Sequence, residues 1–207
     1  MQNTVDTETL NSTEKVQSQT QYEKYIDTKY EYAYSKGGSI IIQNSLPKGE
    51  GYTDPNGKEY FKIIFWSRII NETNNPFELK IDFPVNSYEL PSSPDKHFKI
   101  LLPSDTLILD QVDLNNYGQT NLKSFLDSSI DKPSSLKRTI NPKESSGFYV
   151  VILFDTGIGG PFRTELSIKG QNLFYRISKY KTTAAHLVDE KKINCGSINL
   201  RDLTLRK

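Results

Sequence analysis

The sequence predicts an all-β protein in which about seven to nine antiparallel strands form a two-sheet β-sandwich, with one short helix added. Two observations support this fold class. Apolar side chains recur at every second position in the central part of the chain, and turn-forming residues separate short β-like stretches along most of the remainder. With 207 residues, the chain is long enough to bury a substantial core as one domain.

The central part is residues 58–83, which contains the only tryptophan, Trp66. Residues 58–71 form a strand that is apolar on one face and mixed on the other, and residues 77–83 alternate strictly between apolar and charged side chains. The core face of the first strand is expected to carry Phe61, Ile63, Phe65 and Ile69. Because the polar segment 71–76 separates the two strands, we expect them to pair as a hairpin.

The C-terminal half supplies further strands. Residues 148–155 (FYVVILFD) are apolar on both faces, which predicts a second central strand that pairs with or packs on the Trp66 strand. Residues 162–169 and 173–178 flank a turn at Gly170 and predict a hairpin. Between the halves, residues 120–130 place apolar side chains at helical spacing behind Thr120, which predicts a short helix with a threonine cap.

The order of elements in residues 136–178 is a strand, a polar loop, an aromatic-rich strand and a hairpin. This order resembles that of immunoglobulin-like domains of bacterial surface proteins. The Cys–Trp–Cys spacing of true immunoglobulin domains is absent, so the resemblance concerns architecture. It implies an immunoglobulin-like sandwich.

Composition divides the chain into three parts. Residues 1–21 are almost entirely polar and are expected to be a disordered, flexible tail. Residues 22–180 form the β-sandwich domain, and residues 181–207 form a C-terminal extension that offers a last strand to the same domain. A polar tail of this kind fits a mature envelope protein that follows a removed signal or a lipid anchor, in which case Met1 is an expression start. A cytoplasmic protein with a disordered beginning is the competing interpretation.

The net charge of +1 argues against a dedicated nucleic-acid-binding protein. The charge is nevertheless uneven, because residues 169–207 hold nine basic and three acidic side chains, which indicates either a solvated basic end or an anionic partner. Cys195 is the only cysteine, so an intramolecular disulfide is excluded. As a nucleophile it would need a base such as His97 or His186, and we expect a passive thiol.

Two groups of residues are candidates for binding. Tyr30, Tyr32 and Tyr34 alternate along one predicted strand and, together with Trp66, offer rings to a protein or a sugar; alternatively, the tyrosines lie across the sandwich from an edge strand. The second group lies in the segment DQVDLNNYG and partly matches the oxygen spacing of a calcium-binding loop, although the terminal Glu is missing. Its candidate metal ligands are Asp110, Asp113 and Asn115.

These features predict a non-catalytic interaction or structural module of a bacterial cell-envelope or secreted complex. It would bind a protein partner through a sheet face or edge, without a cofactor, and meet a membrane only through a removed N-terminal anchor. The alternatives are a carbohydrate-binding module that uses exposed tyrosine or tryptophan, and a hydrolase that uses carboxylates such as Asp110, Asp113 and Asp155. Asn11 and Asn71 lie in N-x-Ser/Thr sequons, which matter only in a glycosylating host.

Overall fold

The computed structural model describes residues 21–83, 87–181 and 186–206, and in this part thirteen strands form two antiparallel sheets. Sheet A contains, in spatial order, β13 (Leu203–Leu205), β1 (Ile26–Tyr34), β2 (Ser39–Ser45), β4 (Glu59–Asn71), β9 (Ser145–Asp155), β7 (Ser93–Leu101) and β6 (Tyr88–Leu90), and β3 (Lys48–Thr53) pairs with β4 beside β2. Sheet B contains β10 (Phe162–Lys169), β11 (Asn172–Tyr180), β12 (Leu187–Ile198), β5 (Phe77–Phe83) and β8 (Ser134–Ile140).

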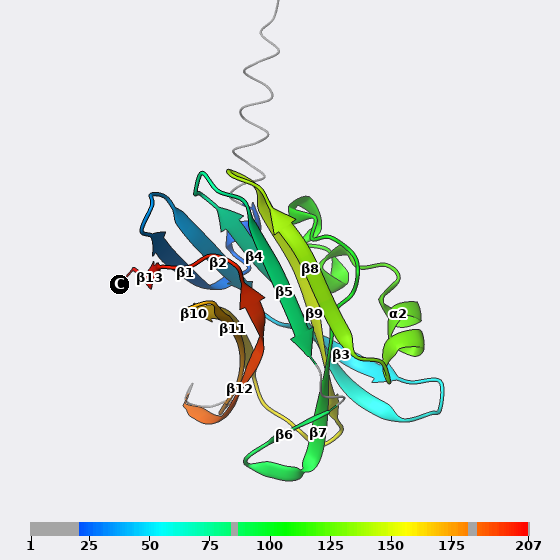
Figure 1. Cartoon of the computed structure of the whole chain (residues 1–207). Coiled ribbons are helices and arrows are strands. Elements are labelled where there is room, and N and C mark those ends of the chain that lie inside the picture. The colour runs from blue at the N-terminus through cyan, green and yellow to red at the C-terminus, as the bar shows by residue number, and fades with distance from the viewer. Residues whose placement is uncertain (1–20, 84–86, 182–185, 207) are drawn as a thin grey trace, which may run out of the picture.

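The elements form three layers (Figure 1). Sheet B packs on one face of sheet A, and the opposite face of sheet A is covered by η1 (Leu109–Gln111), η2 (Asn115–Gly118) and α2 (Leu122–Ser129). Each interface has its own apolar core. The strands β4 and β9 pair in the middle of sheet A and contribute alternate residues to both cores, which explains why both of their faces are rich in apolar side chains.

The expected hairpin of residues 58–71 and 77–83 is wrong. β4 lies in sheet A and pairs with β2, β3 and β9, whereas β5 lies in sheet B and pairs with β8 and β12. The polar segment between them carries the chain from one sheet to the other. Alternation of side chains determines which face of a strand is buried, but it does not determine the strand with which it pairs.

Asn71 secures this crossing between the sheets. Its amide nitrogen donates to the carbonyls of Asn75, Ile140 and Asn141 at 2.8–3.1 Å, and its amide oxygen accepts from the backbone and side chain of Thr73. Because the Asn71 side chain is buried and fully hydrogen-bonded, a glycan on it would not be compatible with this packing. The sequon at Asn11 lies outside the described residues.

Thirteen strands exceed the seven to nine that we expected, because short elements such as β3, β6 and β13 leave only weak patterns in the sequence. The β10–β11 hairpin and the pairing of β9 with β4 are confirmed. The helix is also confirmed, but it follows Asn121 without a side-chain cap bond, so the expected Thr120 cap is wrong. β12 lies between β11 and β5, which places residues 187–198 inside sheet B. The predicted tail, residues 1–21, lies almost entirely outside the described residues.

Candidate functional site

The three predicted tyrosines lie on β1, on the face of sheet A that is turned toward sheet B. Tyr32 is only 2% exposed, and its hydroxyl accepts a hydrogen bond from the backbone N–H of Ile168 at 2.9 Å. Tyr30 is half-buried and donates its hydroxyl hydrogen to Glu165 on β10. Tyr34 is also half-buried and packs at the end of the same core. The tyrosines therefore lie across the sandwich, and they do not form an open row of rings.

Trp66 lies in the second core, between sheet A and its helical cover. It is 0% exposed, and its ring meets that of Tyr117 edge-on, with 6.4 Å between the ring centroids. An exposed binding role for Trp66 is therefore wrong. The mixed face of β4 suggested partial cover, but the helical segments that complete this cover are distant in sequence.

The predicted metal loop is held by a lysine of its own protein. The ammonium group of Lys48, on β3, donates to the carbonyl oxygens of Val112 and Leu114 at 2.7 and 2.5 Å, and lies 4.8 and 4.3 Å from the ring centroids of Tyr25 and Tyr117. Burial is the main cause that lowers the pKa of Lys48. A cation of the protein itself therefore already binds two backbone carbonyls of this loop.

The predicted ligands themselves have other surroundings. Asp113 accepts a hydrogen bond from the Gln21 side chain, and the Asn115 side chain bonds to the N–H of the next residue. Asp110 lies in η1. In the described part of the chain, no three His, Cys, Asp or Glu side chains cluster in a way that could hold a metal ion.

Asp155 lies apart from Asp110 and Asp113. The N–H of Ile108, two residues before Asp110, contacts the Tyr149 hydroxyl. Asp155 lies six residues beyond Tyr149 on β9, which corresponds to about 20 Å along the strand. The two carboxyl groups of a glycoside hydrolase are about 5–10 Å apart. Asp155 instead binds Lys58 at 2.9 Å and the backbone N–H of His97 at 2.8 Å. The buried Cys195 has its pKa raised to about 12 by burial, so its thiol is neutral near pH 7.

One feature joins the predicted tyrosines to a surface groove. Two cavities of about 430 and 590 Å³ share Glu165 and follow β10 where it passes β1. We call this groove the β10 trough. Its main lining residues are Asp27, Thr28, Tyr30 and Tyr32 of β1; Arg163, Glu165, Ser167, Ile168 and Lys169 of β10; Arg176 and Tyr180 of β11, with Lys181 directly after it; Glu190 and Lys192 of β12; and Leu203–Leu205 of β13. β1 and β13 form one wall, and the outer face of sheet B forms the other.

The edge of β10 inside the trough is closed by side chains of sheet A. The Asn44 amide accepts from the N–H of Leu166 at 2.9 Å and donates to its carbonyl at 3.2 Å. The next outward N–H, that of Ile168, is bonded to Tyr32. β10, the strand that ends sheet B, therefore has the backbone groups that point away from β11 hydrogen-bonded at these positions.

The edge of β13 is different. Thr204 pairs with Ala33, the Arg206 N–H donates to the Glu31 carbonyl, and the Asp202 carbonyl accepts from the Ser35 N–H. In an antiparallel pair, every second residue bonds to the neighbouring strand. The N–H and C=O groups of Leu203 and Leu205 therefore point away from β1. β13 ends sheet A, and no backbone bond to these groups exists among the described residues. Leu205 is 48% exposed. A short open strand edge therefore borders the trough.

Charged groups inside the trough are tightly linked. Glu165 accepts from Arg176 at 2.5 Å as well as from Tyr30, and Arg176 also lies 3.5 Å from Glu190. Burial, followed by the hydrogen bond to Glu165, raises the pKa of Tyr30 well above its usual range. At the other end, burial raises the pKa of Asp27 although Arg163 lies 3.3 Å away.

A second hollow was missed by the sequence reasoning. A cavity of about 630 Å³ lies between the β3–β4 hairpin and residues 156–160, and Phe61 is 39% exposed beside it. The alternation of β4 predicted Phe61 in the core, and this is wrong, because Phe61 is exposed and does not belong to the buried cluster between the sheets.

Among the described residues, no helix is long and apolar enough to span a membrane. The chain was also compared with known proteins. No family model, no curated protein and no solved structure matches it.

Proposed function

We propose that the protein is a non-catalytic interaction module that binds an extended segment of a protein partner along β13 and over the β10 trough. The observation that carries the proposal is the open edge at Leu203 and Leu205, next to a groove large enough for side chains. An extended peptide that joins a sheet edge gains main-chain hydrogen bonds, and pockets for its alternate side chains provide specificity.

The contrast between neighbouring edges supports this choice. Asn44 and Tyr32 close the edge of β10, whereas exposed Leu205 leaves the edge of β13 apolar. Proteins usually protect open edges, because an unprotected edge is a template for another strand. An edge left open beside a groove is therefore a reasonable docking site.

A peptide-display selection against the full chain tests the proposal, followed by affinity measurements on two variants. Leu205→Pro removes the outward N–H without touching the bonds to β1, and Leu205→Ala keeps this N–H while it removes the side chain. We expect Leu205→Pro to weaken binding about tenfold more than Leu205→Ala, because a strand-addition hydrogen bond would be lost. Equal affinities of the two variants, at unchanged melting temperature, would contradict binding along this edge.

The wider assignment rests on the same site. We propose an immunoglobulin-like module of a cell-envelope or secreted complex, supported by the antiparallel two-sheet packing. Fractionation of the native host with an antibody against the chain tests the location, and recovery in the cytoplasm alone would contradict it.

A carbohydrate-binding role has one supporting observation, which is the exposed Phe61 ring in the cavity of about 630 Å³. Sugars stack on exposed aromatic faces, and Glu59 and Thr156 would offer polar groups at the rim. A glycan array probed with the wild type and with Phe61→Ala tests this role. Signals that Phe61→Ala retains would rule out this ring as the platform.

A further inference from the structure

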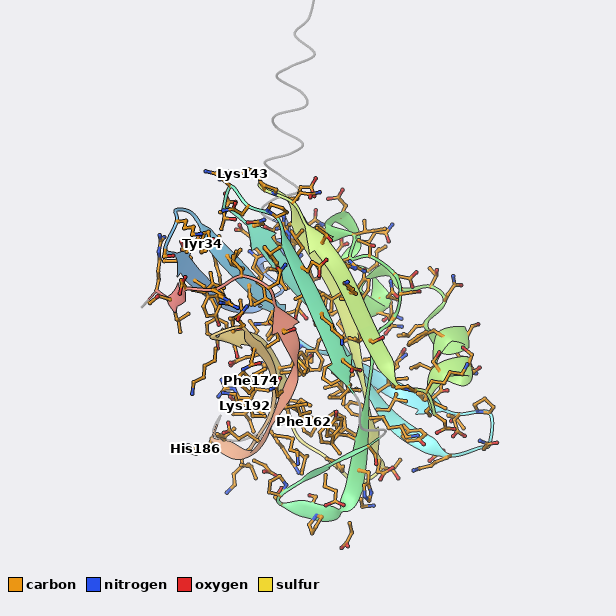
Figure 2. The ribbon with its side chains drawn as sticks, viewed as in Figure 1. Tyr34, Lys143, Phe162, Phe174, His186 and Lys192 are labelled. Atoms are coloured by element: carbon orange, nitrogen blue, oxygen red, sulfur yellow. The ribbon has the colours of Figure 1, made fainter. Side chains whose placement is uncertain are left out.

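The outer face of sheet B presents side chains in cross-strand rows toward the β10 trough. Glu165 of β10 lies opposite Arg176 of β11, which lies opposite Lys192 of β12. In the next row, Ser167 lies opposite Phe174. The Lys192 ammonium is 4.6 Å from the centroid of the Phe174 ring, and Figure 2 shows the two labelled side chains on this face.

The charges of this surface do not balance. Five cationic side chains line the trough, namely Arg163, Lys169, Arg176, Lys181 and Lys192, against the three carboxylates of Asp27, Glu165 and Glu190. All three carboxylates lie within 4 Å of an arginine, which leaves no acid free for the lysines. Lys169, Lys181 and Lys192 have no carboxylate within 4 Å in the described part of the chain.

We propose that the partner segment is acidic and carries carboxylates at alternate positions on the side that faces the trough. This inference rests on the proposed function, since it describes the segment that would extend sheet A at β13. Complementary charge is what an interface uses to select its partner and its register.

The register of β13 explains why alternate positions matter. Leu203 and Leu205 pair with Tyr34 and Tyr32, so their side chains are turned to the same face of the sheet as these tyrosines. Residues of an added antiparallel strand that lie opposite Leu203 and Leu205 would face the trough as well. Successive residues of this kind are about 7 Å apart, so flexible lysines on separate strands can reach them.

The test compares two synthetic peptides against the full chain by calorimetry at low and high salt. The acidic probe is Thr-Glu-Val-Glu-Val-Glu-Val-Thr, and its matched control carries lysine at the three glutamate positions. We expect the acidic probe to bind about tenfold tighter or more at low salt, and the difference to shrink at high salt. In the charge-reversed variant Lys169→Glu/Lys192→Glu, we expect the preference to invert. Both lysines are exposed, so the variant should keep its melting temperature.

The outcomes separate this inference from the function on which it rests. Equal affinity for both peptides, lost in Leu205→Pro, would overturn the acidic preference and leave edge binding intact. A preference that survives the charge reversal would also overturn it. If neither peptide binds, the acidic-strand inference is wrong, and the display selection decides separately whether the edge binds any segment.

Discussion

Replacing Asn44 by alanine tests how the two sheets are joined beside the trough. Asn44 is 1% exposed, and its amide makes four hydrogen bonds: it accepts from the Leu166 N–H and the Ser67 hydroxyl, and it donates to the Leu166 carbonyl and the Thr28 hydroxyl. Alanine removes all four and leaves the buried backbone groups of Leu166 without partners. Asn44 had no distinctive signal in the sequence, although its side chain satisfies the backbone groups at the β10 edge of sheet B.

The expected cost follows from these contacts. A buried donor or acceptor that loses its partner costs about 1–3 kcal/mol, and here both backbone groups of Leu166 and the buried Ser67 hydroxyl are affected. We therefore expect Asn44→Ala to lower the free energy of unfolding by about 3–5 kcal/mol. This is a large part of the roughly 5–15 kcal/mol that is usual for a domain.

Denaturant unfolding of the wild type and the variant measures this difference. The denaturant dependence should stay the same while the midpoint falls. Asn172→Ala is the matched control, because Asn172 is exposed at the start of β11 and its side chain makes no hydrogen bond within the described residues; its effect should stay within about 0.5 kcal/mol. A loss below about 1 kcal/mol for Asn44→Ala would refute the reasoning, because water would then replace the amide at the β10 edge.

The remaining predictions concern the second core. Lys48→Met should destabilise the fold by about 1–3 kcal/mol, because two loop carbonyls lose their donor, whereas exposed Lys36→Met should not; denaturant unfolding measures both. Calcium should leave the wild-type melting temperature unchanged, since the Lys48 ammonium already binds these carbonyls, and a rise would contradict this account. Burial raises the Tyr117 pKa from 10.0 to about 12 in the folded protein. The contribution of the neutral Tyr117 side chain to the free energy of unfolding is therefore complete below pH 10 and is lost as the pH rises toward 12. The difference in free energy of unfolding between wild type and Tyr117→Phe should change over this interval and stay constant below it.

Local alternation was a reliable guide to which side chains are buried. The predicted core faces of β5 and β9 and the Ile63, Phe65 and Ile69 side chains of β4 lie in the cores, because the two-residue period of a strand is a property of its backbone; Phe61, predicted on the same face of β4, is exposed. The β10–β11 hairpin was predicted for the same reason, since its turn is local. Each of these predictions depends on residues close together in the chain.

The binding candidates depended on contacts between distant residues, and there the sequence was a poorer guide. Trp66 is covered by a helical segment more than forty residues away, and the Tyr32 hydroxyl meets β10 through a bond that spans 136 residues. The predicted metal loop meets Lys48 of β3, which has no link to it in the sequence pattern. The exposure of a side chain depends on which distant elements pack over it, and only the tertiary structure shows these elements.

The sequence by itself determined an all-β chain, most of the buried side chains of β4, β5 and β9, and the position of one hairpin and one helix. The tertiary structure decided the partner of each strand, the crossing at Asn71, the cover over Trp66 and the trough in which Tyr30, Glu165 and Arg176 meet. The physical reason is that side-chain period is set within a few residues. Strand pairing and cavities instead arise from contacts across the whole chain, whose free energies depend on every element at once.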